Sequence, residues 1–258
     1  MLIPPKAEEW QSGRMRSLGK RVYRKVSQVQ ILSPPSWVGE RFESFLPAML
    51  RKARQAGTLS ASASWEMSMK KLPKSFYQQP AIHIAKDYLG KYLVFNSAKG
   101  KVSGKIIDVE AYPAFSDKVS HGNKRTTRTE VMYHEGGYAY VYIIYGTHHQ
   151  FAVVVNKESI PEVVFIRAVT PDEGVKVMKE NFGKKVKNVR ELTKSPGNLC
   201  KSFGVNMSLY GEDLTGDKIF IEDRGMVVEP KDISYGKRVG VNNILEGSEQ
   251  KLRFFLKI

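Results

Sequence analysis

The stretch Lys105-Ile-Ile-Asp-Val-Glu-Ala-Tyr112 is the part of the sequence that best indicates both a strand and a site. In a strand, successive side chains point to opposite faces. We therefore expect two sets of residues, one made of Ile107, Val109 and Ala111 and the other of Asp108, Glu110 and Tyr112. A carboxylate beside aromatic surface suits a general base, because burial raises its pKa toward neutrality. A solvated strand glutamate is the ordinary alternative on spacing alone.

Further strands are predicted on both sides of this stretch, with helices between them. β-Branched and aromatic runs indicate strands at 92–95, 102–112, 138–145, 151–155 and 163–169. Helical spacing and capping residues indicate helices over 81–89, from Thr170-Pro-Asp-Glu173 as a capping box, and from Ser195-Pro196. Strands and helices do not alternate regularly. The sequence therefore predicts a single α+β domain with a curved, mostly antiparallel β-sheet and packed helices.

The composition indicates a globular protein with a polyanionic partner. The chain has 258 residues, of which 41 are Lys or Arg and 26 are Asp or Glu, giving a formal charge of +15. Apolar residues make up 41% of the chain, which excludes a collagen-like or wholly disordered protein. No apolar run approaches the roughly 18 residues of a membrane span, so we expect no membrane partner. A basic excess is typical of proteins that bind nucleic acid.

The first 66 residues differ in composition from the rest. Residues 1–66 contain seven Arg and four Lys, whereas residues 67–258 contain seven Arg and 23 Lys. The first part also holds all three tryptophans, Trp10, Trp37 and Trp65. We interpret 1–66 as a disordered or spurious extension, because Val29-Gln-Ile-Leu-Ser-Pro-Pro35 resembles a translated transfer-RNA gene. Met67 or Met69 would then be the start, and a basic arm that adds DNA affinity is the alternative.

A tyrosine-rich stretch is a second candidate for function. The tyrosines fall within 13 residues and are Tyr133, Tyr138, Tyr140, Tyr142 and Tyr145. Lys124, Arg125 and Arg128 precede them. Bases stack on such rings while cations meet phosphates, which favours a nucleic-acid site, although a Tyr-rich core strand fits equally well. Tyr145 precedes Gly146, where a strand must turn and the ring can project.

Metal chemistry is not expected. His121 lies in a polar loop without a local ligand partner, and His148 and His149 are adjacent rather than spaced on one face. The single cysteine, Cys200, excludes an internal disulfide and any multi-cysteine zinc site.

Taken together, these residues resemble the alkyladenine (3-methyladenine) DNA glycosylase family, of the class without a helix-hairpin-helix. The resemblance runs from about Lys86 to Phe255. Its motifs, in chain order, are Val109-Glu-Ala-Tyr112, His121-Gly122, Tyr140-Val-Tyr-Ile-Ile-Tyr-Gly146, Arg167-Ala168, Ser195-Pro-Gly-Asn-Leu-Cys200, Glu222-Asp-Arg-Gly225, Arg238-Val-Gly-Val241 and Leu252-Arg-Phe-Phe255.

The resemblance implies a monofunctional DNA glycosylase over residues 67–258. Such an enzyme flips alkylated or deaminated purines out of double-stranded DNA, hydrolyses the N-glycosidic bond and leaves an abasic site. It implies no cofactor and no metal, and we expect a monomer in the cytoplasm of a bacterium, associated with the nucleoid. A non-catalytic damaged-DNA-binding module of the same fold, or a hydrolase of modified nucleosides or RNA, are the alternatives.

By the same resemblance, a few residues take catalytic roles. Glu110 would deprotonate a water and aim it at the anomeric carbon. Arg167 and the backbone carbonyl of Val239 would help to hold that water. Tyr145 would enter the minor groove and fill the place of the flipped base.

The resemblance also assigns the walls of the base pocket. Tyr112 would lie against one face of the base, with His121 and Tyr142 against the other. Seven residues after the intercalating tyrosine the family usually has Asn, whose amide crowds the amino group of guanine. This chain has Ala152 there. We expect weaker discrimination against guanine or a changed lesion range.

Overall fold

The computed structural model describes residues 70–115, 117–241 and 244–257. They belong to a compact unit that spans Met69–Ile258. The predicted extension 1–66, with its possible late start and its alternative role as a DNA-binding arm, lies outside the described residues. That expectation stays a prediction.

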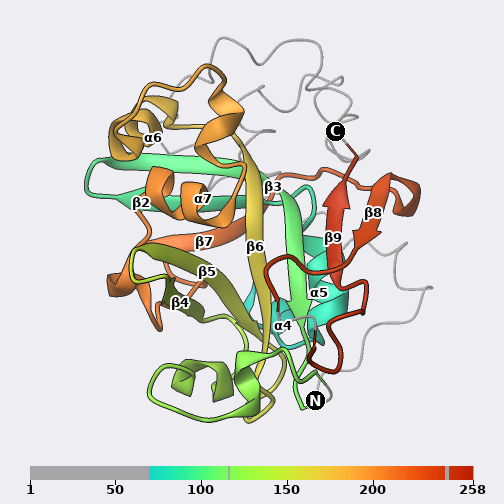
Figure 1. The fold of residues 1–258 in the computed structure, drawn as a ribbon. Helices are drawn as coiled ribbons and strands as arrows, with labels where there is room; N and C mark the ends of the chain where they lie inside the picture. Colours follow the sequence, from blue (N-terminus) through green and yellow to red (C-terminus); the bar gives the residue numbers. More distant parts are fainter. Residues whose placement is uncertain (1–69, 116, 242–243, 258) are drawn as a thin grey trace, which may run out of the picture. The chain divides into compact units, whose positions relative to one another are not determined.

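One curved sheet of nine strands organises the described part of the chain (Figure 1). Each strand pairing found there is antiparallel, and the order is β1-β7-β2-β3-β6-β5-β4, with β9 also paired to β3 and β8 to β9. The strands are β1 (Lys70–Lys71), β2 (Tyr92–Ser97), β3 (Gly100–Tyr112), β4 (Ala139–Ile144), β5 (His148–Val155), β6 (Glu162–Pro171), β7 (Ile219–Asp223), β8 (Ile233–Gly236) and β9 (Arg253–Leu256). The predicted α+β class with an antiparallel sheet is confirmed.

Short helices pack on this sheet. The α-helices are α4 (Lys74–Tyr77), α5 (Ala81–Tyr88), α6 (Val175–Phe182) and α7 (Pro196–Phe203). Single 3-10 turns lie at η3 (His121–Asn123), η4 (Glu130–Tyr133), η5 (Val189–Leu192), η6 (Met207–Leu209) and η7 (Pro230–Asp232). The predicted starts of two helices are confirmed. α5 follows Pro80, and α7 is capped by Ser195, whose hydroxyl accepts a hydrogen bond from the backbone N–H of Asn198 at 3.4 Å.

The capping box predicted at Thr170–Glu173 is wrong. The first two residues of that stretch continue β6 and pair with β3, because the sheet offers them hydrogen-bond partners. The helix α6 begins only after Gly174, whose φ of 73° lies in the left-handed region that glycine tolerates. Asp172 binds Arg224 at 2.6 Å instead of capping a helix. A tertiary ion pair therefore replaces the local cap.

Two irregularities interrupt the ladder between β3 and β6. Ile106 pairs with Val169 and Asp108 with Ala168, so that Ile107 is left without a partner on β6. Asp108 pairs with Ala168 and Val109 with Ile166, so that Arg167 of β6 is left without a partner on β3. A β-bulge of this kind shifts the alternation of side chains. The prediction that Ile107 shares the face of Val109 is therefore wrong, since the fully buried core residue is Ile106.

The sheet has two faces with separate apolar clusters. On the first, which we call the core face, Val164 and Ile166 of β6 join a large core with α5 and α7. On the second, which we call the pocket face, Val163 and Phe165 of the same strand join a small cluster of tyrosines. Along Val163–Ile166, successive side chains alternate between the two clusters. The pocket face is the side on which the predicted site residues gather.

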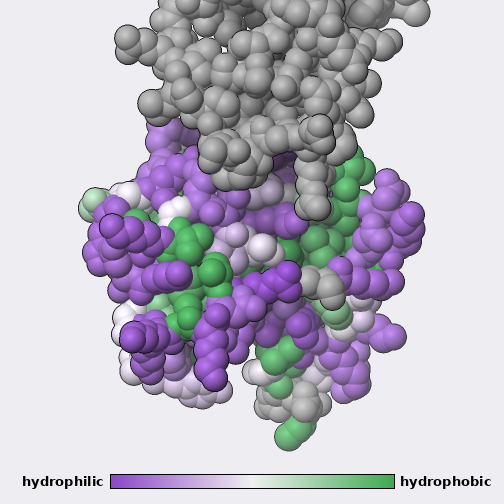
Figure 2. Space-filling model, turned by 90° about the horizontal axis from the view of Figure 1, so that it is seen from above, coloured by the Kyte–Doolittle hydropathy of each residue, from purple (hydrophilic) through white to green (hydrophobic). Residues whose placement is uncertain are grey.

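No helix in the described part of the chain is long and apolar enough to cross a membrane. On the face seen in Figure 2, hydrophilic side chains cover most of the coloured surface, and hydrophobic ones form smaller patches between them. The segment 184–194, just before α7, carries exposed lysines.

Candidate active site

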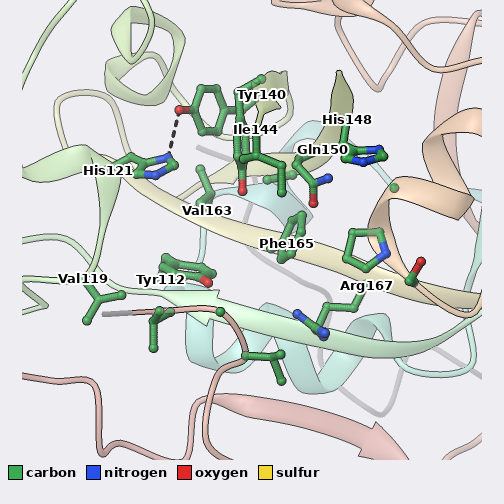
Figure 3. Close-up of a pocket in the computed structure, with 18 of the residues that line it drawn as sticks. Tyr112, Val119, His121, Tyr140, Ile144, His148, Gln150, Val163, Phe165 and Arg167 are labelled. Carbon is green, nitrogen blue, oxygen red and sulfur yellow. Dashed lines mark hydrogen bonds between the residues drawn. The ribbon is translucent and has the colours of Figure 1, made fainter. Parts of the chain in front are cut away.

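A cavity of about 590 Å³ opens on the pocket face (Figure 3). Strands β3 to β6, the turn η3, the first turn of α7, residues 239–241 and Leu245 line it. It brings together residues that the sequence predicted from distant segments. Those in the wall are Tyr112, His121, Tyr142, Tyr145, Ala152, Arg167 and Val239.

Glu110 lies directly behind this wall, with its side chain wholly buried. Its Oε2 accepts a hydrogen bond from the Tyr112 hydroxyl at 2.9 Å, and its Oε1 accepts one from the Val239 backbone N–H at 2.8 Å. The Arg167 guanidinium lies 2.9 Å from the same Oε1. Burial raises the pKa of Glu110, while Arg167 and the two hydrogen-bond donors oppose that rise. The carboxyl is held in one orientation and its proton affinity is increased.

The contact of Val239 with Glu110 involves its N–H. The predicted use of the Val239 carbonyl, to hold a water, therefore concerns a different atom of this residue and stays a prediction.

Two arginines and two carboxylates form a compact charge cluster around Arg167. Arg167 reaches Glu110, and its Nε lies 3.5 Å from Asp108. Arg253 of β9 binds Asp108 through two hydrogen bonds of 3.0 and 2.8 Å. The bulge at Arg167 turns this side chain toward both carboxylates, as bulges beside active sites commonly do. Because the charges balance, burying Glu110 costs less than it would alone.

Aromatic rings enclose the cavity from two sides. In Figure 3, Tyr112 lies on one side, and His121 and Tyr140 lie across the open space. Tyr142 stacks on Tyr140 with ring centroids 4.9 Å apart, and His121 meets Tyr142 edge-on at 5.1 Å. Behind Tyr112, the Arg238 guanidinium sits 4.7 Å from the ring centroid. A flat ring could stack between these walls.

His121 is held as a neutral ring. Its Nδ1 lies 3.1 Å from the Tyr140 hydroxyl, which fixes the imidazole against the wall. Burial, and to a lesser extent the charge of Arg128, lowers the pKa of His121 to about 4. An uncharged imidazole next to the cavity does not repel a cationic ligand.

The hairpin between β4 and β5 puts Tyr145 at the cavity rim. Its side chain is 88% exposed, and its φ of 49° lies in the left-handed region, followed by Gly146 at 71°. A bulky residue in this conformation is strained, and such strain is concentrated at functional sites. The hairpin thus holds an aromatic ring out into solvent beside the opening.

Ala152 forms part of the cavity floor. It pairs with Tyr140 on one side and with Phe165 on the other, and Phe165 in turn pairs with Glu110. These residues form one row across four strands. Ala152 is 1% exposed, so the floor at this point is a methyl group without hydrogen-bonding capacity.

Two features of the site were not predicted. The first is a buried ion pair between Arg238 and Asp117, in which Arg238 also donates to the backbone carbonyls of Ala111 and Gly247 at 3.2 and 3.1 Å. It ties the segment that carries Val239 to the end of β3. The second is Gln150, a buried amide in the cavity wall. The Arg238-Val-Gly-Val241 motif was the available signal for the first, and the sequence offered none for the second.

The described residues were compared with the ligand sets that hold metal ions. No group of three or more His, Cys, Asp or Glu side chains there has the arrangement of a metal site. Cys200 is buried in the core, where burial raises the pKa of its thiol. The cavity wall presents aromatic rings, the Arg167 guanidinium and the Gln150 amide, with the Glu110 carboxyl directly behind it.

Comparison with known proteins identifies relatives of this chain. The family model of methylpurine-DNA glycosylase (MPG) matches residues 75–258. A protein of Desulfitobacterium hafniense (strain Y51) is 39% identical over 197 residues, covering 73% of this chain and 96% of the relative. One of Natranaerobius thermophilus is 41% identical over 189 residues, covering 72% and 96%. One of Bacillus subtilis (strain 168) is 38% identical over 187 residues, covering 72% and 92%. Each bears the name "Putative 3-methyladenine DNA glycosylase".

Proposed function

This chain belongs to the methylpurine-DNA glycosylase family, and on that premise we propose that it is a monofunctional glycosylase that flips damaged purines out of duplex DNA. The proposed substrates are alkylated and deaminated purines, and the proposed product is an abasic site. One observation carries the proposal. It is the buried Glu110, fixed by Arg167 at 2.9 Å, behind a cavity with aromatic walls.

The proposed reaction uses Glu110 as the general base. Its carboxylate takes a proton from water while the water oxygen bonds to the anomeric carbon. The N-glycosidic bond breaks, and its electron pair leaves with the base. Arg167 favours the ionised form of Glu110 and helps to orient the water. A raised pKa makes Glu110 a better proton acceptor at neutral pH than an ordinary glutamate.

The aromatic walls support selection of electron-poor bases. The flipped ring would stack on Tyr112 on one side and meet His121 and Tyr142 on the other. A positively charged alkylated purine is attracted to the faces of these rings. His121, being neutral above a pH of about 4, adds no opposing charge. Cationic bases are also good leaving groups, so this site needs no strong acid to activate them.

The absence of a lysine among the described wall residues supports a monofunctional reaction. A lyase would need an amine to form a Schiff base with the sugar. Water activated by Glu110 is the nucleophile that this site provides.

The exposed ring of Tyr145 supports the assignment of the wedge. Flipping costs a few kcal/mol of stacking energy, and a ring inserted into the gap recovers part of it. A basic segment precedes α7, whose first turn lines the cavity. Its exposed cations are Lys184, Lys185, Lys187, Arg190 and Lys194. Such cations are suited to the phosphates on either side of a flipped nucleotide.

Ala152 supports a wide lesion range. An apolar, small side chain at this place in the floor leaves room beside the bound base. We propose that guanine-derived lesions enter the pocket as well as adenine-derived ones. We further propose that the protein acts as a monomer on the nucleoid DNA of a bacterium.

The test uses duplexes that carry hypoxanthine or 1,N6-ethenoadenine and a methylated duplex that carries 3-methyladenine. Free base released into solution, together with strands that break only after alkali, is the expected result. Binding to the damaged duplex without base release would instead indicate a non-catalytic damage sensor. Strand breaks before alkali would contradict the monofunctional reaction.

A further inference from the structure

Gln150 is a buried polar residue in the cavity wall that the proposed reaction does not use. It lies on β5, directly opposite Tyr142 and two residues before Ala152 on the same face. The residue is 4% exposed and its side chain lines the cavity. In Figure 3 the amide of Gln150 points into the open space above Phe165. A buried amide costs free energy unless its polar atoms find partners.

The orientation of this amide is set by the neighbouring backbone. Its Nε2 donates a hydrogen bond to the carbonyl of His149 at 2.9 Å. Turning the amide over would put Oε1 against that carbonyl, and two acceptors would then face each other. The oxygen is therefore the atom that faces the cavity. Within the described residues, no group donates a hydrogen bond to it.

We infer that Gln150 is a specificity-determining residue whose Oε1 accepts a hydrogen bond from an exocyclic amino group of the flipped purine. This inference rests on the proposed excision of bases from DNA. A purine with an amino group at the right edge satisfies the buried oxygen. A purine without it leaves the oxygen unpaired, and one with a carbonyl there adds repulsion.

The neighbouring floor residue makes this contact possible. Ala152 has no atom beyond its β-carbon, so it neither competes for the amino group nor fills the space beside it. The amide two residues away then becomes the polar group of the β5 wall. In this chain the residue of β5 that contacts the amino group of the purine is therefore Gln150 rather than the residue at position 152.

The test compares lesions that differ by one amino group and share an N7 methyl group. The first pair is 7-methylguanine and 7-methylhypoxanthine, which differ at position 2. The second pair is 7-methyladenine and 7-methylpurine, which differ at position 6. Single-turnover excision is measured for the wild type, for Gln150→Leu and for Gln150→Met. Leucine and methionine both remove the acceptor but fill the space differently, so a shared result reports the hydrogen bond rather than the packing.

The wild type is expected to favour the amino base of at least one pair by about tenfold, the effect of one net hydrogen bond. Both variants should lose that preference, and their rate for the base without the amino group should be equal to or above that of the wild type, because no unpaired oxygen remains. The pair that responds identifies the edge that is read. Equal losses on all four bases, or no loss of preference, would overturn the inference. A wild type that excises none of the four bases would instead contradict the proposed function itself.

Discussion

The core face and the pocket face alternate along the same strands, yet they bury different chemistry. On β6, Val164 and Ile166 enter an apolar core, whereas the next residue, Arg167, enters a cluster of charges on the opposite face. On β3, Val109 packs in the core while Glu110 is equally buried but ionisable. The core face holds the larger apolar cluster and should contribute most of the folding free energy, because apolar burial is the dominant favourable contribution.

The comparison shows that the pocket face lowers the stability of the fold. Burial makes the charged form of Glu110 less stable, and the arginine and hydrogen-bond donors offset only part of that cost. The strained Tyr145 adds a further cost on this side. Substitutions on the core face should therefore reduce stability, and those on the pocket face should mainly reduce activity.

The largest expected change in stability follows Phe151→Ala on the core face. Phe151 is fully buried, and truncating a buried Phe costs about 3–5 kcal/mol of unfolding free energy. Tyr142→Ala on the adjacent strand is the matched pocket-face variant. Compared with Phe151→Ala, it should have a smaller loss of unfolding free energy and a larger loss of excision rate. Urea unfolding and single-turnover rates on the same samples compare the two. A Tyr142 variant that is less stable but fully active would break the distinction.

Next in size is the effect of Asp117→Ala, which leaves Arg238 buried without its partner. Removing one partner of a buried ion pair costs about 3 kcal/mol or more. The double variant Asp117→Leu, Arg238→Met removes both charges, and we expect it to unfold at higher urea than the single variant. Thermal and urea unfolding measure this. If the single and double variants are equally unstable, the ion pair does not hold this segment in place.

A smaller effect is expected at the hairpin, where Tyr145→Gly removes the exposed ring. Glycine adopts φ of 49° without strain, so stability should stay the same or rise by about 1 kcal/mol. Excision should fall about tenfold, because one stacking interaction with DNA is lost. Unfolding curves and single-turnover assays test both statements. Unchanged excision would count against Tyr145 as the wedge.

The smallest effects are shifts with pH, and the two titrating residues act in opposite directions. Since the pKa of Glu110 is raised above its ordinary 4.5, the stability that its protonated form contributes is lost as pH rises through that raised value. The pKa of His121 is lowered from 6.5 to about 4, so its contribution is present above 6.5 and is lost as pH falls toward 4.

Unfolding measured from pH 4 to 8 in Glu110→Gln and His121→Gln separates these effects. Relative to the wild type, the first variant should gain stability as pH rises, and the second should lose its disadvantage as pH falls. The acid limb of the excision rate should lie above pH 4.5 and persist in His121→Gln, because it reports Glu110. If the acid limb of the pH–rate profile disappears in His121→Gln, the titrating group is His121 instead.

Local patterns in the sequence predicted much of the fold. Alternating strands, the helix after Pro80 and the cap at Ser195 depend on neighbouring residues, and each was found in the structure. Errors arose where tertiary contacts override local preference. The bulge at Ile107 and the delayed start of α6 are decided by pairing between β3 and β6, which no single segment encodes.

For the candidate site, the sequence indicated which residues to expect but not the contacts between them. Several motifs of the resemblance contribute residues to one cavity, as expected for a family likeness. The contact of Asp117 with Arg238 joins residues 121 positions apart, and Gln150 matters only because its neighbours leave its oxygen unpaired. Such relations depend on three-dimensional proximity and were not accessible from spacing in the sequence.

The central claim is that Glu110, among the carboxylates of the pocket face, is the catalytic base. The most direct measurement compares single-turnover base release by Glu110→Gln and by the matched variant Asp108→Asn, with binding to the damaged duplex measured in parallel. We predict that Glu110→Gln loses about 10²–10⁴-fold in rate while it still binds the damaged DNA, because a general base contributes that much. Asp108→Asn should lose about tenfold or less, since Asp108 contacts Arg167 and its charge has only a minor influence on Glu110. Base release by Glu110→Gln at a rate close to that of the wild type would contradict the account.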